Sequence, residues 1–199
     1  MATSRPEILA VVLLCIAAGS AAGAQEREQL PIQITAELGL RYDSQKGVVE
    51  YGGVTITQGE TRITADRAVT AGVAFEDSKW QFSGTVRISM PEAALASDTA
   101  EVRFAGGEIA SAVVTGAPAT FTQKREDEQS EGRANRIDYD LKRGTVEFTG
   151  DAWLKDARTE VTSETLVYST VNQRVNSGEP VVITIQPEEK SPETPKPPS

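Results

Sequence analysis

The stretch Tyr42–Gly59 reads YDSQKGVVEYGGVTITQG, and it contains one complete structural unit. The aromatic residue Tyr42 opens the unit. The polar segment Ser44–Gly47 that follows is suited to a hairpin turn, because Gly47 can adopt the positive φ that tight turns require. Val54 and Ile56 then alternate with threonines, which is typical of a half-buried strand. The pattern predicts a strand, a tight turn, a strand, a glycine corner and a further strand.

The same unit recurs along the chain. Residues Tyr139–Gly150, YDLKRGTVEFTG, repeat Tyr, Asp, Gly, Val, Glu, an aromatic residue and a final Gly in register. Looser copies open at Phe75, Phe104 and Tyr168, so the openers lie 33, 29, 35 and 29 residues apart. Each copy reaches a glycine 9 to 12 residues after its opener: Gly53, Gly84, Gly116, Gly150 and Gly178. A period of about 30 residues predicts repeated supersecondary units, each too small to bury its own apolar face.

The alternation of apolar residues changes parity inside three of these copies. An acidic residue marks each change: Asp66, Asp98 and Glu164. A change of parity within a strand-rich segment predicts a bulge or bend, and an acidic residue there is expected to be solvated. Because turn residues recur throughout and no segment has the pattern of a helix, the fold class is predicted as all-β and antiparallel.

The two ends of the chain differ in composition from the repeats. Residues 1–24 combine an unbroken apolar run, Ile8–Ala18, with the small residues Ala22-Gly23-Ala24, which predicts a secretory signal peptide cleaved before Gln25. A retained membrane anchor is the alternative. Residues 187–199 hold five prolines and no aromatic residue, which is typical of a disordered tail. The predicted folded domain is therefore residues 25–186.

The composition excludes several classes of function. The chain has no histidine and a single cysteine, Cys15, which lies in the predicted signal peptide, so Ser-His-Asp and Cys-His catalysis are excluded and zinc lacks its usual ligands. A net charge of −9 disfavours binding to nucleic acid. No pair of carboxylates is singled out for acid–base chemistry. We therefore expect no enzymatic activity, no cofactor and no metal site.

The inward-facing positions are mostly small and aliphatic. A repeating sheet that folds over on itself with such side chains would leave an apolar groove suited to an extended acyl ligand. An ordinary filled sandwich core would show the same alternation. The residue pattern alone leaves both interpretations open.

Several blocks of sequence resemble a known family. They are PIQITA at Pro31–Ala36, VEYGGVTITQGETRITADRAV at Val49–Val69, TGAPATFTQ at Thr115–Gln123, EGRANRIDYDLKRGTVEFTGDAWL at Glu131–Leu154 and SETLVY at Ser163–Tyr168. Together they are similar to the LptA family of periplasmic lipopolysaccharide-transport proteins, in the OstA-like superfamily. The resemblance covers residues 31–186 in order.

This resemblance implies a β-jellyroll of antiparallel strands, shaped like a folded taco, whose apolar interior holds the acyl chains of lipopolysaccharide. It implies a non-enzymatic periplasmic carrier that bridges the inner and outer membranes. The implied partners are lipopolysaccharide and the homologous OstA-like domains of the inner-membrane export complex and the outer-membrane translocon. Copies of the chain would also associate head to tail by strand addition at the sheet edges.

Site residues follow from the resemblance by position. The matching lipid-facing positions are Ile32, Phe121, Tyr139 and Leu141. The matching edge-assembly positions are Ile32, Ile34, Val182, Ile183 and Ile185. One alternative is a membrane-anchored LptC-like component of the same machine. A second alternative is a structural β-solenoid or adhesion module with a filled core. The segment 75–112 has an additional strand pair relative to the shortest family members, which would lengthen the groove or displace these positions.

Overall fold

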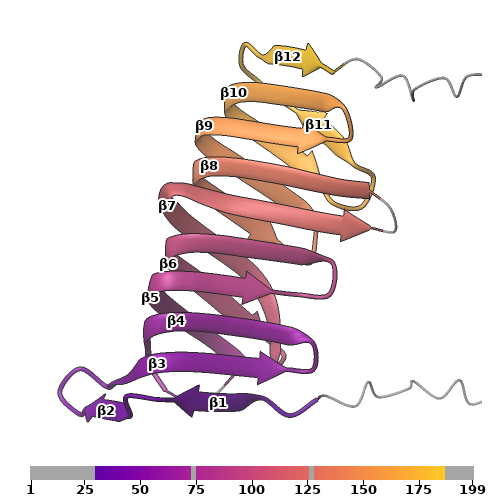
Figure 1. The fold of residues 1–199 in the computed structure, drawn as a ribbon. Helices are drawn as coiled ribbons and strands as arrows, with labels where there is room; N and C mark the ends of the chain where they lie inside the picture. The colour runs from indigo at the N-terminus through magenta and orange to yellow at the C-terminus, as the bar shows by residue number, and fades with distance from the viewer. Residues whose placement is uncertain (1–29, 73–74, 126–127, 187–199) are drawn as a thin grey trace, which may run out of the picture.

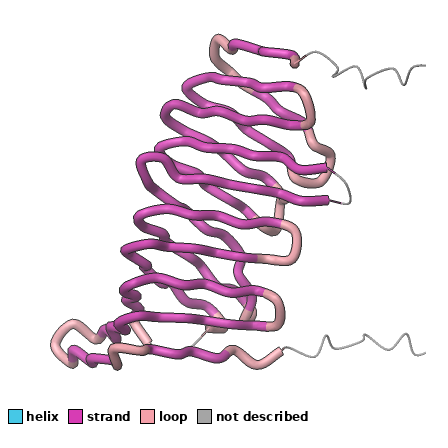
Figure 2. Tube along the Cα trace, viewed as in Figure 1, coloured by secondary structure: helices cyan, strands magenta, loops and turns pink. Residues whose placement is uncertain are grey.

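A computed structural model describes residues 30–72, 75–125 and 128–186. The predicted signal peptide and the predicted tail lie outside these described residues. Within them the chain is almost entirely β-strand, joined by short turns (Figure 2). None of the described residues forms a helix long and apolar enough to cross a membrane.

The described chain contains strands of 3 to 18 residues. They are β1 (Gln33–Ala36), β2 (Leu40–Asp43), β3 (Val48–Gln58), β4 (Thr61–Thr70), β5 (Asp77–Ser89), β6 (Ala93–Ala105), β7 (Glu108–Arg125), β8 (Glu128–Asp140), β9 (Thr145–Asp156), β10 (Thr159–Ser169), β11 (Arg174–Asn176) and β12 (Val182–Ile185). The predicted openers Tyr42, Phe104, Tyr139 and Tyr168 lie at or near the end of a strand, and Phe75 lies two residues before β5, so one repeat corresponds to two strands.

All the strands belong to one antiparallel sheet. Its order is β1-β3-β4-β5-β6-β7-β8-β9-β10-β11, and neighbours in sequence are therefore neighbours in space from β3 to β11. Strand β2 pairs with the half of β3 that β1 leaves open, and β12 pairs with the half of β10 that β11 leaves open. The sheet is folded over on itself and has two open edges (Figure 1). The prediction of an all-β, antiparallel, folded jellyroll is confirmed.

A column of irregular pairings creates the fold of the sheet. The register shifts at the three predicted acidic positions, between Thr64 and Arg67, between Ala96 and Thr99, and between Ser163 and Thr165. Asp66, Asp98 and Glu164 are exposed there, so the predicted solvated bends are confirmed. The corner glycines lie in the same column; Gly84, for example, has φ +75° and falls between the paired residues Ser83 and Val86.

The column divides the sheet into two arms. The front arm of Figure 1 comprises residues 54–65, 86–97, 119–134 and 152–163, and the rear arm comprises residues 48–52, 67–83, 99–115, 136–149 and 165–169. Within each arm the residues alternate between the inner face and the outer face, as the pleat requires. The inner faces of the two arms pack against each other and bury the core.

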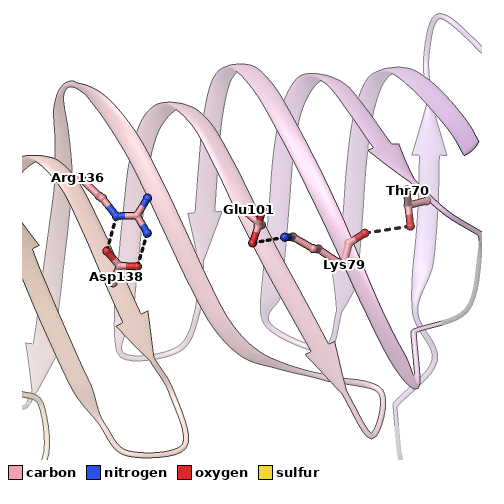
Figure 3. A network of polar contacts seen from close by, with 5 residues as sticks. All are labelled: Thr70, Lys79, Glu101, Arg136 and Asp138. Carbon is pink, nitrogen blue, oxygen red and sulfur yellow. Dashed lines mark hydrogen bonds and ion pairs between the residues drawn. The ribbon is translucent and has the colours of Figure 1, made fainter.

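The outer face is polar and carries paired charges. Figure 3 shows Lys79 bonded to Glu101 at 2.7 Å and Arg136 bonded to Asp138 at 2.7 Å on the rear arm. These side chains are about half exposed, so each pair contributes at most roughly 1 kcal/mol to stability. A concave region of about 530 Å³ on this face is lined by such polar and paired side chains, which makes it unsuited to a hydrocarbon chain.

Candidate functional site: the interior and the two edges

The candidate site is the apolar space between the two arms. On the rear arm the inner positions of β3, β5 and β6 carry Tyr51, Trp80, Phe82 and Phe104, all buried. The Trp80 ring stacks on Tyr51 at 5.5 Å between centroids and on Phe75 at 4.9 Å. Aliphatic residues on the front arm, such as Ile56, Ile63 and Ile88, form the opposite wall. This half of the interior has an aromatic wall and an aliphatic wall.

The half of the interior toward the C-terminus is built around Phe121. This residue lies on the front arm, is fully buried, and meets three rings of the rear arm edge-to-face: Tyr139 at 5.8 Å, Phe148 at 5.9 Å and Tyr168 at 6.2 Å between centroids. The structure therefore brings together two of the predicted lipid-facing residues, Phe121 and Tyr139. In this conformation they contact each other and their neighbours.

The other two predicted lipid-facing residues lie elsewhere. Leu141 is half-buried in the turn after β8, where its N–H donates to the Ala110 carbonyl oxygen at 3.1 Å, so it lies at the rim of the interior. Ile32 packs against the core just before β1, and five strand pairings separate β1 from β7. The structure does not bring Ile32 together with the other three residues.

A buried polar network connects the two arms beside Phe121. The Tyr168 hydroxyl on the rear arm donates to Gln123 Oε1 on the front arm at 3.0 Å and lies 3.1 Å from Ser130 Oγ. Ser130 Oγ also donates to Asp156 Oδ1 at 2.9 Å, and Gln123 Nε2 donates to the Thr170 carbonyl oxygen at 3.3 Å. Every buried polar side-chain atom of the described residues has a partner.

This network was missed in the sequence analysis, although the sequence contains a signal for it. Gln123 follows Phe121 by two residues, and Ser130 precedes Gly132 and Ala134 at the same parity. The alternation therefore places a polar side chain at an inner position on each of two adjacent strands. A polar residue at an expected core position indicates a specific hydrogen-bond partner.

Further contacts tie the two rims of the folded sheet together. Arg125 Nη1 on the front rim donates to the carbonyl oxygens of Thr170 and Val171 at 3.1 and 3.2 Å on the rear rim. At the opposite end, Gln58 Nε2 donates to the Gly107 carbonyl oxygen at 3.0 Å. The two arms are thus joined through their rims as well as through the core.

The inner tyrosines resist ionisation. Burial raises the pKa of the Tyr168 hydroxyl above its usual value, and its hydrogen bond with Ser130 opposes that rise. Burial raises the pKa of Tyr139 in the same way, with a hydrogen bond to Thr170 acting against it. Burial also raises the pKa of Tyr51. A neutral interior is compatible with an apolar ligand.

The apolar inner face continues to both edges of the sheet. At the edge toward the N-terminus, Leu40 and Tyr42 of β2 lie opposite Tyr51 and Val49, which places them on the inner face. They are 66% and 64% exposed, since no further strand among residues 30–72, 75–125 and 128–186 covers them. The predicted edge residue Ile34 lies opposite Ile56 on the inner face of β1 and is half-buried.

The opposite edge has the same character. Ile183 and Ile185 of β12 lie opposite Val161 and Thr159, on the inner face, and are 58% and 72% exposed. Val182 lies on the outer face of the same strand and is also exposed. The structure therefore places four of the predicted edge residues, Ile34, Val182, Ile183 and Ile185, on the outermost strands β1 and β12, and the fifth, Ile32, immediately before β1.

No metal site is formed by the described residues: they contain no cluster of three or more His, Cys, Asp or Glu side chains that could hold an ion. The groups that converge between the arms are aromatic rings, aliphatic side chains and a few hydrogen-bonding groups, with the half-buried Asp156 carboxylate beside Ser130. Such an interior can bury hydrocarbon and pair with a few polar groups.

The chain is similar to several solved structures, among them one crystal structure of a lipopolysaccharide-transport component. The crystal structure is of LptH from Pseudomonas aeruginosa, described as the LptA-homologous periplasmic component of the conserved lipopolysaccharide transport device. It shares 21% identity with the chain, the match covers 81% of this chain and 98% of that one, and the TM-score is 0.43. The comparison with curated proteins gave no match.

The family model carries the description LptA/(LptD N-terminal domain) LPS transport protein and matches residues 68–174, from β4 to β11. That span is 107 of the 199 residues, more than half of the chain. The chain belongs to the LptA/LptD N-terminal-domain family of lipopolysaccharide-transport proteins.

Proposed function

We propose that the chain is a periplasmic carrier that holds the acyl chains of lipopolysaccharide between its two arms. The observation that carries the proposal is the inner face, which is predominantly apolar from one edge of the sheet to the other and is exposed at both edges. Leu40 and Tyr42 mark one end, and Ile183 and Ile185 mark the other. Membership in a family of lipopolysaccharide-transport proteins supports the same ligand.

Apolar burial is the driving force in this proposal. Removing hydrocarbon from water stabilises a complex by roughly 25 cal/mol per Å². The net charge of −9 cannot attract a phosphorylated lipid, so electrostatic capture makes no contribution. Passage along the interior is passive, and the energy for transport comes from an ATPase elsewhere in the machine.

Edge-to-edge assembly extends the interior from one domain to the next. Within the part of the chain that the structure describes, the outer sides of β1 and β2 at one edge, and of β11 and β12 at the other, pair with no strand. Unpaired main-chain groups on such edges are templates for strand addition. Head-to-tail joining to a second copy, or to a homologous domain of the inner-membrane complex or outer-membrane translocon, would cover the exposed inner-face side chains.

Export to the periplasm requires the N-terminal segment. Residues 1–24 serve as a cleaved signal peptide in this proposal, and residues 25–186 form the carrier domain. Mass spectrometry of the exported protein is expected to find Gln25 at the N-terminus. A retained Met1–Ala24 would instead support the membrane-anchored, LptC-like role.

Photo-crosslinking tests the carrier role. A photoreactive residue at Tyr139 or Leu141, on or beside the inner face, is expected to form an adduct with lipopolysaccharide. The same residue at Gln81, which is exposed on the outer face of the rear arm, serves as the control and is expected to form none. Absence of an adduct at both inner positions, or an equal yield at Gln81, would overturn the proposal and favour a filled structural module.

A further inference from the structure

Three polar side chains occupy inner positions beside Phe121, where most of the neighbouring inner residues are apolar. Gln123 and Ser130 lie on the front arm and are 4% and 3% exposed, and Tyr168 lies on the rear arm and is fully buried. Three different strands, β7, β8 and β10, supply them. Desolvating these groups costs free energy that only hydrogen bonds recover, so their presence in an apolar interior calls for a physical reason.

The hydroxyl groups of this network have fewer hydrogens than the number of hydrogen-bonding contacts that they make. Three contacts link the two hydroxyls to each other and to their acceptors: Tyr168 with Gln123 Oε1, Tyr168 with Ser130 Oγ, and Ser130 with Asp156 Oδ1. The Tyr168 and Ser130 hydroxyl groups each have one hydrogen to donate. At most two of the three contacts can therefore carry a hydrogen at any moment. The network has acceptor capacity left for one more donor.

Two of these contacts, that of Tyr168 with Gln123 and that of Tyr168 with Ser130, cross from one arm to the other. Separating the arms to admit an acyl chain at this point pulls Tyr168 away from Gln123 and Ser130. A plain hydrocarbon chain would leave the Tyr168 hydroxyl and Gln123 Oε1 without these partners, which carries a penalty, while Ser130 keeps Asp156 on its own arm. A chain with a hydroxyl or an amide N–H near its polar end would supply the missing donor and restore the pairing.

We propose that the network of Gln123, Ser130 and Tyr168 is a specificity-determining subsite that selects acyl ligands carrying a hydrogen-bond donor, a hydroxyl or an amide N–H, near the polar end of the chain. The inference rests on the proposed function, because it requires acyl chains to lie between the arms. It adds a criterion for choosing among amphiphiles that apolar burial alone does not provide.

A matched pair of probes tests the subsite. Isothermal titration calorimetry of the purified protein with β-hydroxymyristate and with myristate compares two ligands that differ by one hydroxyl. We expect the hydroxylated probe to bind about tenfold more tightly, since leaving a buried polar group unpaired carries a penalty of that order. Equal affinities in the wild-type protein would overturn the inference.

Variants test whether these residues cause the preference for the hydroxylated probe. The double variant Gln123→Met, Tyr168→Phe removes both hydrogen-bonding partners together. We expect it to bind the two probes equally and to bind myristate more tightly than the wild-type protein does, because the penalty for unpaired polar groups is gone. Ser130→Ala is a second, smaller change with the same expected direction, and it decides the question if the double variant fails to fold. A preference that persists in a folded variant would overturn the inference.

Thr70→Val is the control. Thr70 is another buried hydroxyl on the inner face, but it donates to the Lys79 carbonyl oxygen within the rear arm at 3.3 Å and does not link the arms (Figure 3). This variant is expected to keep the wild-type preference, and loss of the preference here would overturn the assignment. Failure of lipopolysaccharide and both probes to bind would overturn the carrier role itself. Binding of both probes with equal affinity overturns only the subsite.

Discussion

The ring of Phe148 lies against the bare backbone of Gly132. Phe148 is on the rear arm and Gly132 is on the front arm, and a Cβ added at position 132 would overlap the Phe148 ring and approach Leu154 Cδ1 to 3.3 Å. Both residues are buried. Glycine at this position therefore sets how closely the two arms approach in the half of the interior toward the C-terminus.

Substituting Gly132 is expected to destabilise the fold. The added methyl of Gly132→Ala must push Phe148 out of place, and overpacking of this kind typically costs about 1–3 kcal/mol. Urea denaturation should show a lower midpoint for the variant.

The matched control is Gly178→Ala, because a Cβ at Gly178 meets nothing within 4 Å. We expect its free energy of unfolding to change by less than about 0.5 kcal/mol. Equal effects of the two substitutions would show that the contact between Phe148 and Gly132 does not limit the approach of the arms.

The column of irregular pairings that bends the sheet gives a second prediction. Gly84 has φ +75°, and a Cβ there would collide with the Asp66 side chain on the neighbouring strand. Gly84→Ala is therefore expected to cost both backbone strain, about 1 kcal/mol or more, and a steric term. Gly47→Ala isolates the first contribution, since Gly47 has φ +64° with nothing within 4 Å of its Cβ position.

Thermal unfolding should show a larger loss for Gly84→Ala than for Gly47→Ala. Combining Gly84→Ala with Asp66→Ala is expected to recover the steric part only, because the positive φ remains. If the double variant were as unstable as the single one, close approach of Asp66 would not be the cause.

Sequence pattern was sufficient for much of this fold. The alternation of residues, the recurring turn at Gly47 and Gly144, and the change of parity at Asp66 each report a local backbone preference, and a sheet of consecutive hairpins is built from local preferences. The family was recognisable because several such blocks occur in a fixed order. The prediction of no enzymatic activity is confirmed by membership in a family of transport proteins.

The interior could not be derived in the same way. Whether Phe121 lines a groove or fills a core depends on how closely two arms distant in sequence approach, and inward alternation is the same in both cases. In the structure Phe121 is covered by three rings of the opposite arm. The pairing of Gln123 and Ser130 with Tyr168 likewise joins residues 38 to 45 positions apart, which a local pattern does not reveal.

Alkaline pH is expected to destabilise the protein through its inner tyrosines. Burial raises the pKa values of Tyr51, Tyr139 and Tyr168 in the folded state. Above the unfolded value of about 10, the unfolded chain loses these protons while the folded chain keeps them, so stability falls as pH rises. Each such group contributes a slope of up to about 1.4 kcal/mol per pH unit.

The measurement is urea denaturation at a series of pH values from neutral to strongly alkaline. The unfolding midpoint should stay level below pH 9 or so and fall above about pH 10. Tyr168→Phe should show a shallower fall than the wild-type protein, since one titrating group is absent. An identical fall in the variant would mean that Tyr168 ionises equally in both states.

Charge placed on the inner face of β12 is expected to block self-association without unfolding the domain. Ile183 and Ile185 are largely exposed, so Ile183→Lys and Ile185→Lys remove little packing from the monomer. In a head-to-tail assembly the same positions would become buried, and a lysine there would lose the apolar burial and add an unpaired charge. We expect the association constant to fall at least tenfold, measured by sedimentation velocity over a range of protein concentrations. Val171→Lys is the matched control, because Val171 is also apolar and exposed but lies in the turn after β10 and not on an edge strand. If the two β12 variants associate as the wild-type protein and the Val171→Lys control do, the edge formed by β12 is not the joining surface.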